Sequence, residues 1–194
     1  MPEPLKNLYT PKLIDTLSTA IKSRYADFNS REFKRYVFDQ NWQQLELKQR
    51  LRHVTEGLHK FLPDSYSQAL KILKPVCINM TGFEYMFFPD YVALYGLEHY
   101  DESIIALEHF TRYSTSEMAV RYFIIKYPKK MMAQMLRWSR SDNYHLRRLS
   151  SEGCRPRLPW SMALPEFKKD PSPVIKILER LKQDDSEYVR RSVA

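Results

Sequence analysis

Glu152 is the residue whose type and position most strongly indicate chemistry. It lies in the stretch RRLSSEG (147–153), directly before a glycine that ends a helical pattern. A carboxylate there faces the negative end of the helix dipole, which disfavours it by roughly 0.3–1 kcal/mol. One explanation is an ion pair with Arg148, four residues earlier, although surface pairs of this kind contribute little. The other is a functional site, in which Arg155 and Arg157 keep Glu152 ionised and bind phosphates on either side.

The second candidate carboxylate is Glu117, in the stretch STSEMAVR (114–121). The residues alone favour a capping box here, in which Ser114 caps a helix and Glu117 reaches back to the backbone. The stretch DDSE (184–187) repeats that arrangement, which strengthens the structural interpretation. A catalytic carboxylate is the alternative.

Two tryptophans and two histidines are further candidates for site residues. Trp160 follows a proline in a loop, where it either anchors the loop or offers its face to a cationic group. Trp138 lies at the apolar spacing of its helix, so we assign it to the core. His109 and His145 have no ligand partners at metal spacing, and the sequence has no glycine-rich phosphate loop or nucleophile elbow. We expect no metal and no cofactor.

These residues lie on helical hairpins that repeat along the second half of the chain. Residues 127–151 align without gaps with residues 170–194, so that Arg147 and Arg148 match Arg190 and Arg191. A less regular copy, 102–124, also ends in Val-Arg on its second helix. Each unit is a helix, a short polar turn and a second helix with arginines, and an insertion, 153–169, separates the later two units.

Units of this kind predict an all-α fold, a right-handed α-α superhelix of the HEAT or armadillo type. We expect one domain over 1–194, with N-terminal helices in 1–100 and basic repeats carrying the site in 101–194. The second helices would line a concave surface. Because YVRRSVA ends inside a helix without a capping repeat, we expect a further C-terminal part to continue the array.

The net positive charge is confined to residues 112–194. Residues 1–111 hold 13 Lys and Arg against 14 Asp and Glu, whereas residues 112–194 hold 18 against 9. A basic half beside a nearly neutral one is typical of a protein that binds a polyanion. The predicted DNA contacts are its basic residues Arg121, Lys129, Lys130, Arg147, Arg148, Arg155, Arg157, Arg190 and Arg191.

The composition narrows the class of protein further. No run approaches eighteen apolar residues and the start has no apolar signal-peptide core, so we expect no membrane partner. Two cysteines, Cys77 and Cys154, form no disulfide framework or zinc pattern, so we expect buried or semi-buried free thiols in a reducing compartment. We expect a monomer in the bacterial cytosol, associated with the nucleoid when it acts.

Four stretches together resemble the AlkC branch of the AlkC/AlkD DNA alkylation-repair glycosylases: FFPDYVALYG, ALEHFTRYSTSEMAVRYF, RRLSSEGCRPRLPW and EYVRRSVA. The resemblance covers nearly the whole chain. It implies a HEAT-like solenoid that grips alkylated duplex DNA and excises 3-methyladenine and 3-methylcytosine without full extrusion of the base. It also implies that Glu117 and Glu152 are the catalytic carboxylates and that Trp160 borders the lesion.

The implied chemistry, hydrolysis by a monofunctional N-glycosylase, suits these residue types. A methylated base already carries positive charge, and carboxylates stabilise the oxocarbenium-like sugar that develops as it leaves. Three alternatives stay open: a non-catalytic DNA-binding solenoid, a protein-interaction scaffold of HEAT repeats, and an inactive short glycosylase.

Overall fold

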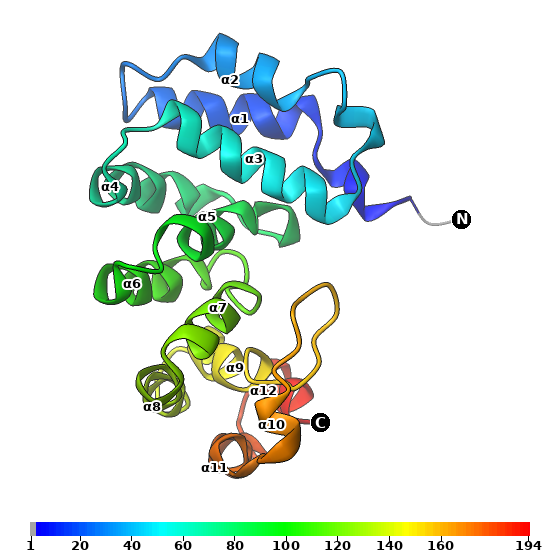
Figure 1. Ribbon diagram of the computed structural model, residues 1–194, viewed down its shortest axis with the longest axis vertical. Helices are drawn as coiled ribbons and strands as arrows, with labels where there is room; N and C mark the ends of the chain where they lie inside the picture. Colours follow the sequence, from blue (N-terminus) through cyan, green and yellow to red (C-terminus); the bar gives the residue numbers. More distant parts are fainter. Residues whose placement is uncertain (1–2) are drawn as a thin grey trace.

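The computed structural model describes residues 3–194, which form an array of stacked helices (Figure 1). Met1 and Pro2, the start of the predicted domain, lie outside the described residues. The described part contains twelve α-helices and four short 3-10 helices, and no strand. The prediction of an all-α helical-repeat fold is therefore confirmed.

The N-terminal half packs its helices between short 3-10 turns. Its α-helices are α1 (Pro11–Lys22), α2 (Ser30–Val37), α3 (Leu47–Phe61), α4 (Tyr66–Val76), α5 (Phe87–Tyr95) and α6 (Tyr100–Phe110). The 3-10 helices are η1 (Leu5–Leu8), η2 (Trp42–Gln44), η3 (Cys77–Asn79) and η4 (Phe83–Tyr85).

The C-terminal half contains the repeating units. Its helices are α7 (Ala119–Lys126), α8 (Pro128–Trp138), α9 (Tyr144–Glu152), α10 (Glu166–Lys169), α11 (Ser172–Leu181) and α12 (Glu187–Val193). Proline in the first turn begins α8, and glycine follows the last residue of α5 and of α9, as helix-end preferences predict.

The helices of the array form two rows, one on each side. Helices α4, α6, α8 and α11 follow one side of the array, and α3, α5, α7, α9 and α12 follow the other (Figure 1). The long loop before α10 extends on the side of the second row, toward α3 and α5. No helix in residues 3–194 is long and apolar enough to cross a membrane.

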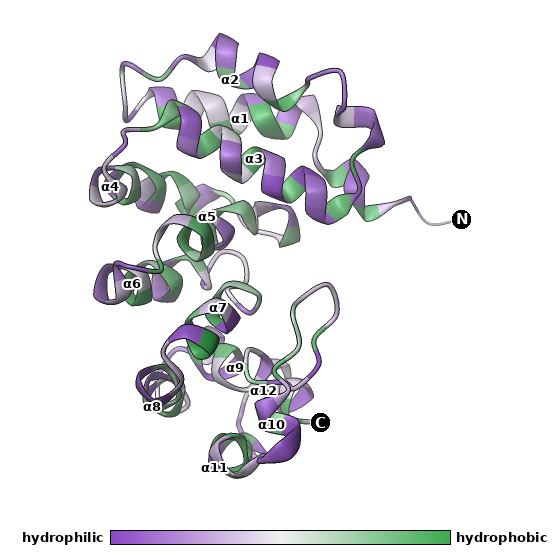
Figure 2. Ribbon diagram, viewed as in Figure 1, coloured by the Kyte–Doolittle hydropathy of each residue, from purple (hydrophilic) through white to green (hydrophobic). Residues whose placement is uncertain are grey.

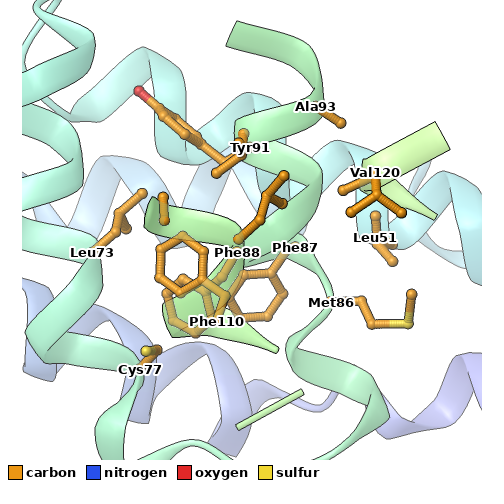
Figure 3. Packing of buried hydrophobic residues seen from close by; sticks show 14 of the residues in the cluster. Leu51, Leu73, Cys77, Met86, Phe87, Phe88, Tyr91, Ala93, Phe110 and Val120 are labelled. Atoms are coloured by element: carbon orange, nitrogen blue, oxygen red, sulfur yellow. The ribbon is translucent and has the colours of Figure 1, made fainter. Parts of the chain in front are cut away.

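One hydrophobic core runs through the array from Tyr9 to Val189. At its centre Phe87, Phe88 and Phe110 are at most 1% exposed, and the rings of Phe88 and Phe110 stack with centroids 5.5 Å apart (Figure 3). Burying each such ring contributes roughly 1.5–3 kcal/mol. Along the helices, hydrophobic and hydrophilic residues alternate in short stretches (Figure 2), and the buried hydrophobic ones form this core. Trp138 is buried, which confirms its assignment to the core.

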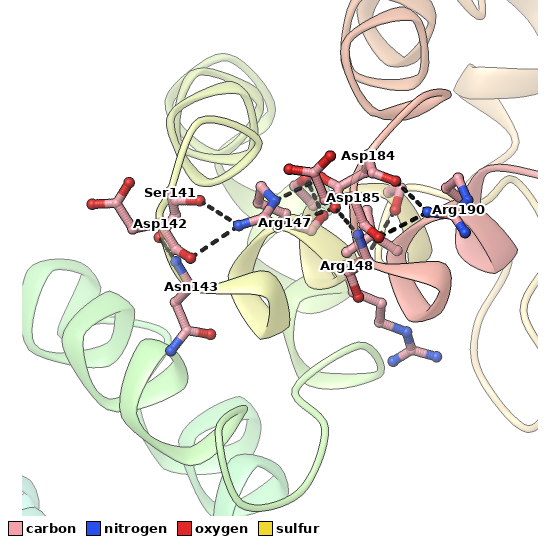
Figure 4. A network of polar contacts seen from close by, with 12 residues as sticks. Ser141, Asp142, Asn143, Arg147, Arg148, Asp184, Asp185 and Arg190 are labelled. Atoms are coloured by element: carbon pink, nitrogen blue, oxygen red, sulfur yellow. Dashed lines mark hydrogen bonds and ion pairs between the residues drawn. The ribbon is translucent and has the colours of Figure 1, made fainter.

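In each of the last two units, an arginine at the equivalent position closes the turn between the two helices. Nη1 of Arg147 donates to the carbonyls of Ser141 and Asp142, at 2.9 and 3.0 Å. Forty-three residues on, Nη1 of Arg190 donates to the carbonyls of Asp184 and Asp185, at 2.5 and 2.9 Å (Figure 4). The alignment of 127–151 with 170–194 thus corresponds to a repeated turn geometry.

A side-chain pair then joins the two units. Nε and Nη2 of Arg147 donate to the two carboxylate oxygens of Asp184, at 2.6 and 3.0 Å. Both side chains are largely buried, with exposed fractions of 19% and 6%. The hydrogen bond from Arg147 lowers the pKa of Asp184, and burial acts in the opposite direction.

Candidate active site

Glu152 is the last residue of α9, and Gly153 follows it because no other residue fits there. A Cβ on Gly153 would lie 2.6 Å from Cγ2 of Val120 and 2.9 Å from the carbonyl oxygen of Leu149. Glycine therefore lets the end of α9 pack directly against α7. This contact brings Glu152 next to the segment that leads into α7 and contains Glu117.

Glu117 does not form the predicted capping box. Helix α7 begins only at Ala119, and the buried Ser114 hydroxyl has no hydrogen-bond partner. The Glu117 carboxylate instead accepts from the hydroxyl of Thr115 at 3.0 Å and from Arg148. The capping interpretation is wrong because the Glu117 carboxylate pairs with Arg148 of α9 and does not accept a hydrogen bond from the backbone before α7.

The matching stretch 184–187 also lacks a capping box. The backbone N–H of Ser186 donates to the Asp184 carboxylate at 2.9 Å, and Glu187 pairs with Arg191 at 2.7 Å. The side chain of Ser186, which precedes α12, accepts no capping bond.

Arg148 holds the two candidate carboxylates together. Its Nη1 pairs with Oε2 of Glu117 and donates to Thr115 at 3.0 Å, while its Nη2 lies 3.8 Å from Oε2 of Glu152. The guanidinium also lies over the ring of Tyr188, 5.0 Å from the centroid. Glu117, Glu152 and Arg148 are 15%, 12% and 16% exposed. Two like charges that would repel each other are thereby kept side by side in a partly buried site.

The protonation of Glu152 is shifted by this setting. Burial raises the pKa of the Glu152 carboxyl, and Arg148 and Arg155 oppose that rise without cancelling it. Nε of Arg155 lies 3.4 Å from Oε2 of Glu152. A carboxylate with a raised pKa and two charged neighbours is the kind of group found at catalytic sites.

Trp160 stands at the tip of the loop between α9 and α10, in strained backbone. Its φ is 59°, in the left-handed region that bulky residues rarely adopt. Trp160 is 51% exposed, and its ring packs against that of Phe83 with centroids 5.6 Å apart. The loop is thus anchored through Phe83 while about half of the Trp160 surface stays exposed, and the strained backbone makes this residue a candidate for a functional role.

A groove of about 720 Å³ begins at Trp160 and runs between α3, α5 and α7. Inside it, Arg52 holds Asp90 by two hydrogen bonds, at 2.9 and 3.0 Å, and contacts the Tyr122 hydroxyl at 3.5 Å. Sequence reasoning missed these three residues and Phe83. They lie far apart in the chain, and no local spacing connects them.

Three basic residues lie on the elements next to Glu152: the partly buried Arg155 and the exposed Arg157 in the loop after α9, and the exposed Arg191 on α12, which packs against α9. Arg155 reaches from Glu152 to the carbonyls of Ser192 and Ala194, at 3.5 and 3.3 Å. The Arg157 residue is exposed, and the Arg191 side chain is 78% exposed. Arg190 is exposed as well, although one of its nitrogens closes the last turn.

Two of the expected DNA contacts are corrected by the structure. Arg121 is fully buried, and its guanidinium donates to backbone carbonyls, so it cannot meet a phosphate. Arg147 uses all its donating nitrogens on Asp184 and the turn. Both arginines stabilise the fold.

Lys129 and Lys130 lie in the first turn of α8, in the row of helices that does not contain α7 and α9 (Figure 1). Lys130 pairs with Asp101 at 3.0 Å and lies 3.7 Å from the ring centroid of Tyr100. The structure therefore does not bring these lysines together with Glu117 and Glu152. Among residues 3–194, no group of three or more His, Cys, Asp or Glu could hold a metal ion.

Comparison with known proteins finds relatives over the whole chain. No model of a protein family matches. The protein YhaZ of Bacillus subtilis (strain 168), described as uncharacterized, is 50% identical over 190 residues, which are 98% of this chain and 53% of YhaZ. A solved structure, Pseudomonas fluorescens alkylpurine DNA glycosylase AlkC bound to DNA containing an abasic site analog, is 36% identical with a TM-score of 0.94. That match covers 100% of this chain and 54% of the AlkC chain. The chain thus spans about half the length of the relatives that it matches.

Proposed function

The chain belongs to the AlkC type of helical-repeat proteins, and from that premise we propose that it is a DNA-repair glycosylase. Its substrate is alkylated duplex DNA, from which it excises N3-methylated cationic bases such as 3-methyladenine and 3-methylcytosine. The observation that carries the proposal is one guanidinium, Arg148, holding Glu117 and Glu152 together in a partly buried site.

The reaction breaks the bond between C1′ of the sugar and the nitrogen of the base. The bonding electron pair leaves with the base and neutralises its positive charge, while an oxocarbenium-like charge develops on the sugar. Glu117 and Glu152 stabilise that positive charge. This electrostatic stabilisation is strongest where water is excluded. One carboxylate takes a proton from the water whose oxygen adds to C1′, and the proton then passes to solvent.

Trp160 supplies selectivity for a charged lesion. Its half-exposed indole, held by Phe83, presents an aromatic face that attracts a cationic base more than a neutral one. Recognition of the lesion within the stack, without full extrusion, is part of the proposal. Arg155, Arg157 and Arg191 would contact phosphates, which fixes register without reading sequence.

Release of free base from methylated duplex DNA tests the activity. We expect the chain to release 3-methyladenine or 3-methylcytosine, and the Glu152→Gln variant to be slower by about 100-fold or more while it still binds DNA. Glu166→Gln is the matched control, because Glu166 pairs with Lys169 on exposed α10. Absence of release above background by the unchanged chain would overturn the proposal.

The same assay, together with titrations of duplex DNA at several salt concentrations, distinguishes the other functions open to this chain. A non-catalytic DNA-binding solenoid, or an inactive short glycosylase, would bind duplex DNA with steep salt dependence and release no base. A protein-interaction scaffold would not bind DNA even at low salt.

A further inference from the structure

Arg121 is the largest fully buried side chain in the described residues, and backbone carbonyls take all its hydrogen bonds. Its Nε donates to the carbonyl of Met162 at 2.7 Å. Its Nη1 donates to the carbonyls of Gly153 and Arg155, at 3.1 and 2.7 Å, and its Nη2 to that of Pro156 at 3.4 Å. The four acceptors lie at the two ends of one loop, 153–162, with Trp160 between them.

The position of Arg121 in its unit matches that of the two turn-closing arginines. Val120, Leu146 and Val189 are each buried, and an arginine follows each of them. Arg147 and Arg190 donate to the carbonyls of their own turns. Arg121 instead donates to the insertion that the sequence places between the later units.

We propose that Arg121 is a positioning residue that clamps the loop 153–162 and thereby fixes Trp160 and the end of α9 at Glu152. A planar guanidinium can donate in several fixed directions at once, so it can tie the start and the end of the loop together. A lysine ammonium is compact and lacks that reach. The consequence for base excision rests on the proposed function, whereas the clamp itself does not.

The surroundings of Arg121 agree with this role. Burial lowers the pKa of its guanidinium, and Cys154, Glu117 and Glu152 act in the opposite direction. Further along the loop, the N–H of Leu164 donates to the carbonyl of Pro156 at 2.9 Å, which closes the loop beside the clamp.

Loop mobility tests the clamp without DNA. Trypsin cleaves after Arg157 but not after Arg155, because Pro156 follows Arg155. We expect Arg121→Lys to speed cleavage after Arg157 by about tenfold or more, since cleavage follows the population of the open loop. Acrylamide quenching of Trp160, measured as the difference from a Trp160→Phe variant in each background, should rise in parallel.

Arg147→Met is the matched control, since Arg147 occupies the same register and holds a turn and Asp184 but not the loop. It should lower the stability of the fold and leave both loop measurements unchanged. Equal cleavage and quenching in a folded Arg121→Lys variant, or the same rise in Arg147→Met, would overturn the proposal.

Two further measurements keep the inference testable. If Arg121 variants do not fold, hydrogen exchange of the unchanged protein decides between the outcomes. The Leu164 amide should exchange as slowly as the amides of α7, and fast exchange would contradict the clamp.

With methylated DNA, Arg121→Lys should lower kcat/KM by about tenfold, and by much less when Trp160→Ala is already present. A chain without glycosylase activity would fail only this last measurement.

Discussion

At the scale of single residues, the protonation of Glu152 gives the sharpest expectation. Burial raises the pKa of its carboxyl above the ordinary 4.5, and only the ionised form can stabilise a positive sugar. The excision rate should therefore fall as the pH drops through this raised pKa. Single-turnover rates across the acidic range measure that limb, and Glu152→Gln should lack it. A limb at or below the ordinary glutamate value would contradict this role.

The same shift predicts how Glu152 affects stability. A folded-state pKa above the unfolded value means that its contribution is present below the unfolded pKa and is lost as the pH rises through the folded one. At neutral pH the ionised Glu152 should therefore lower the stability of the fold. We expect Glu152→Gln to unfold at an equal or higher temperature than the unchanged chain in calorimetry at neutral pH. A clear loss of stability would show that the pairs with Arg148 and Arg155 outweigh burial.

Trp160 should control the preference for charged lesions. Removing its face with Trp160→Ala should reduce the preference for a cationic over a neutral lesion by about 2- to 30-fold, which corresponds to roughly 0.5–2 kcal/mol. Trp160→Phe should retain part of the preference. Competition between the two lesions in one duplex measures the ratio, and an unchanged ratio in Trp160→Ala would assign the ring to packing on Phe83 alone.

At the scale of helices, the pair of Arg147 and Asp184 joins two units. Replacing Asp184 with Asn should lower the free energy of unfolding by about 1–3 kcal/mol, because it leaves a largely buried guanidinium without its charged acceptor. Asp184 has a lowered folded pKa, so its contribution is present above 3.8 and is lost as the pH falls through the folded value. The deficit of Asp184→Asn in urea unfolding should therefore shrink in strong acid. Asp185→Asn, with an exposed side chain, is the control and should change little.

Helix positions followed largely from local patterns, whereas side-chain partners did not. The offset of 43 residues, the end of α9 at Gly153 and the buried Trp138 could all be read from spacing and helix-end preferences. The partner of Glu117 could not, because Arg148 lies on another helix and a capping box fitted the local residues equally well. The burial of Arg121 had the same cause: its carbonyl acceptors belong to an irregular loop that no periodicity describes.

At the scale of the whole molecule, the two rows of helices predict unequal roles for exposed cations. Arg157, on the loop near the carboxylates, should contact a phosphate, so Arg157→Gln should reduce the slope of log affinity against log salt by about 0.9. Lys129→Gln, on α8 in the other row, is the matched control and should leave the slope unchanged. Titrations of duplex DNA at several salt concentrations measure both. Equal losses would show that binding spreads over both rows.

The turn-closing arginine can also be used to locate helical hairpins in related sequences. In the last two units it stands six residues after the first carbonyl that it binds and directly after a buried aliphatic residue. The related proteins are about twice as long as this chain. In the part of a relative that lies outside the match, each aliphatic residue followed by arginine at this spacing would mark one further helical hairpin. Arg121 also follows a buried aliphatic residue, but it binds the irregular stretch after the second helix of the next unit instead of its own turn. An arginine at this position in a relative would therefore mark either a closed turn or a residue that holds an insertion one unit further on.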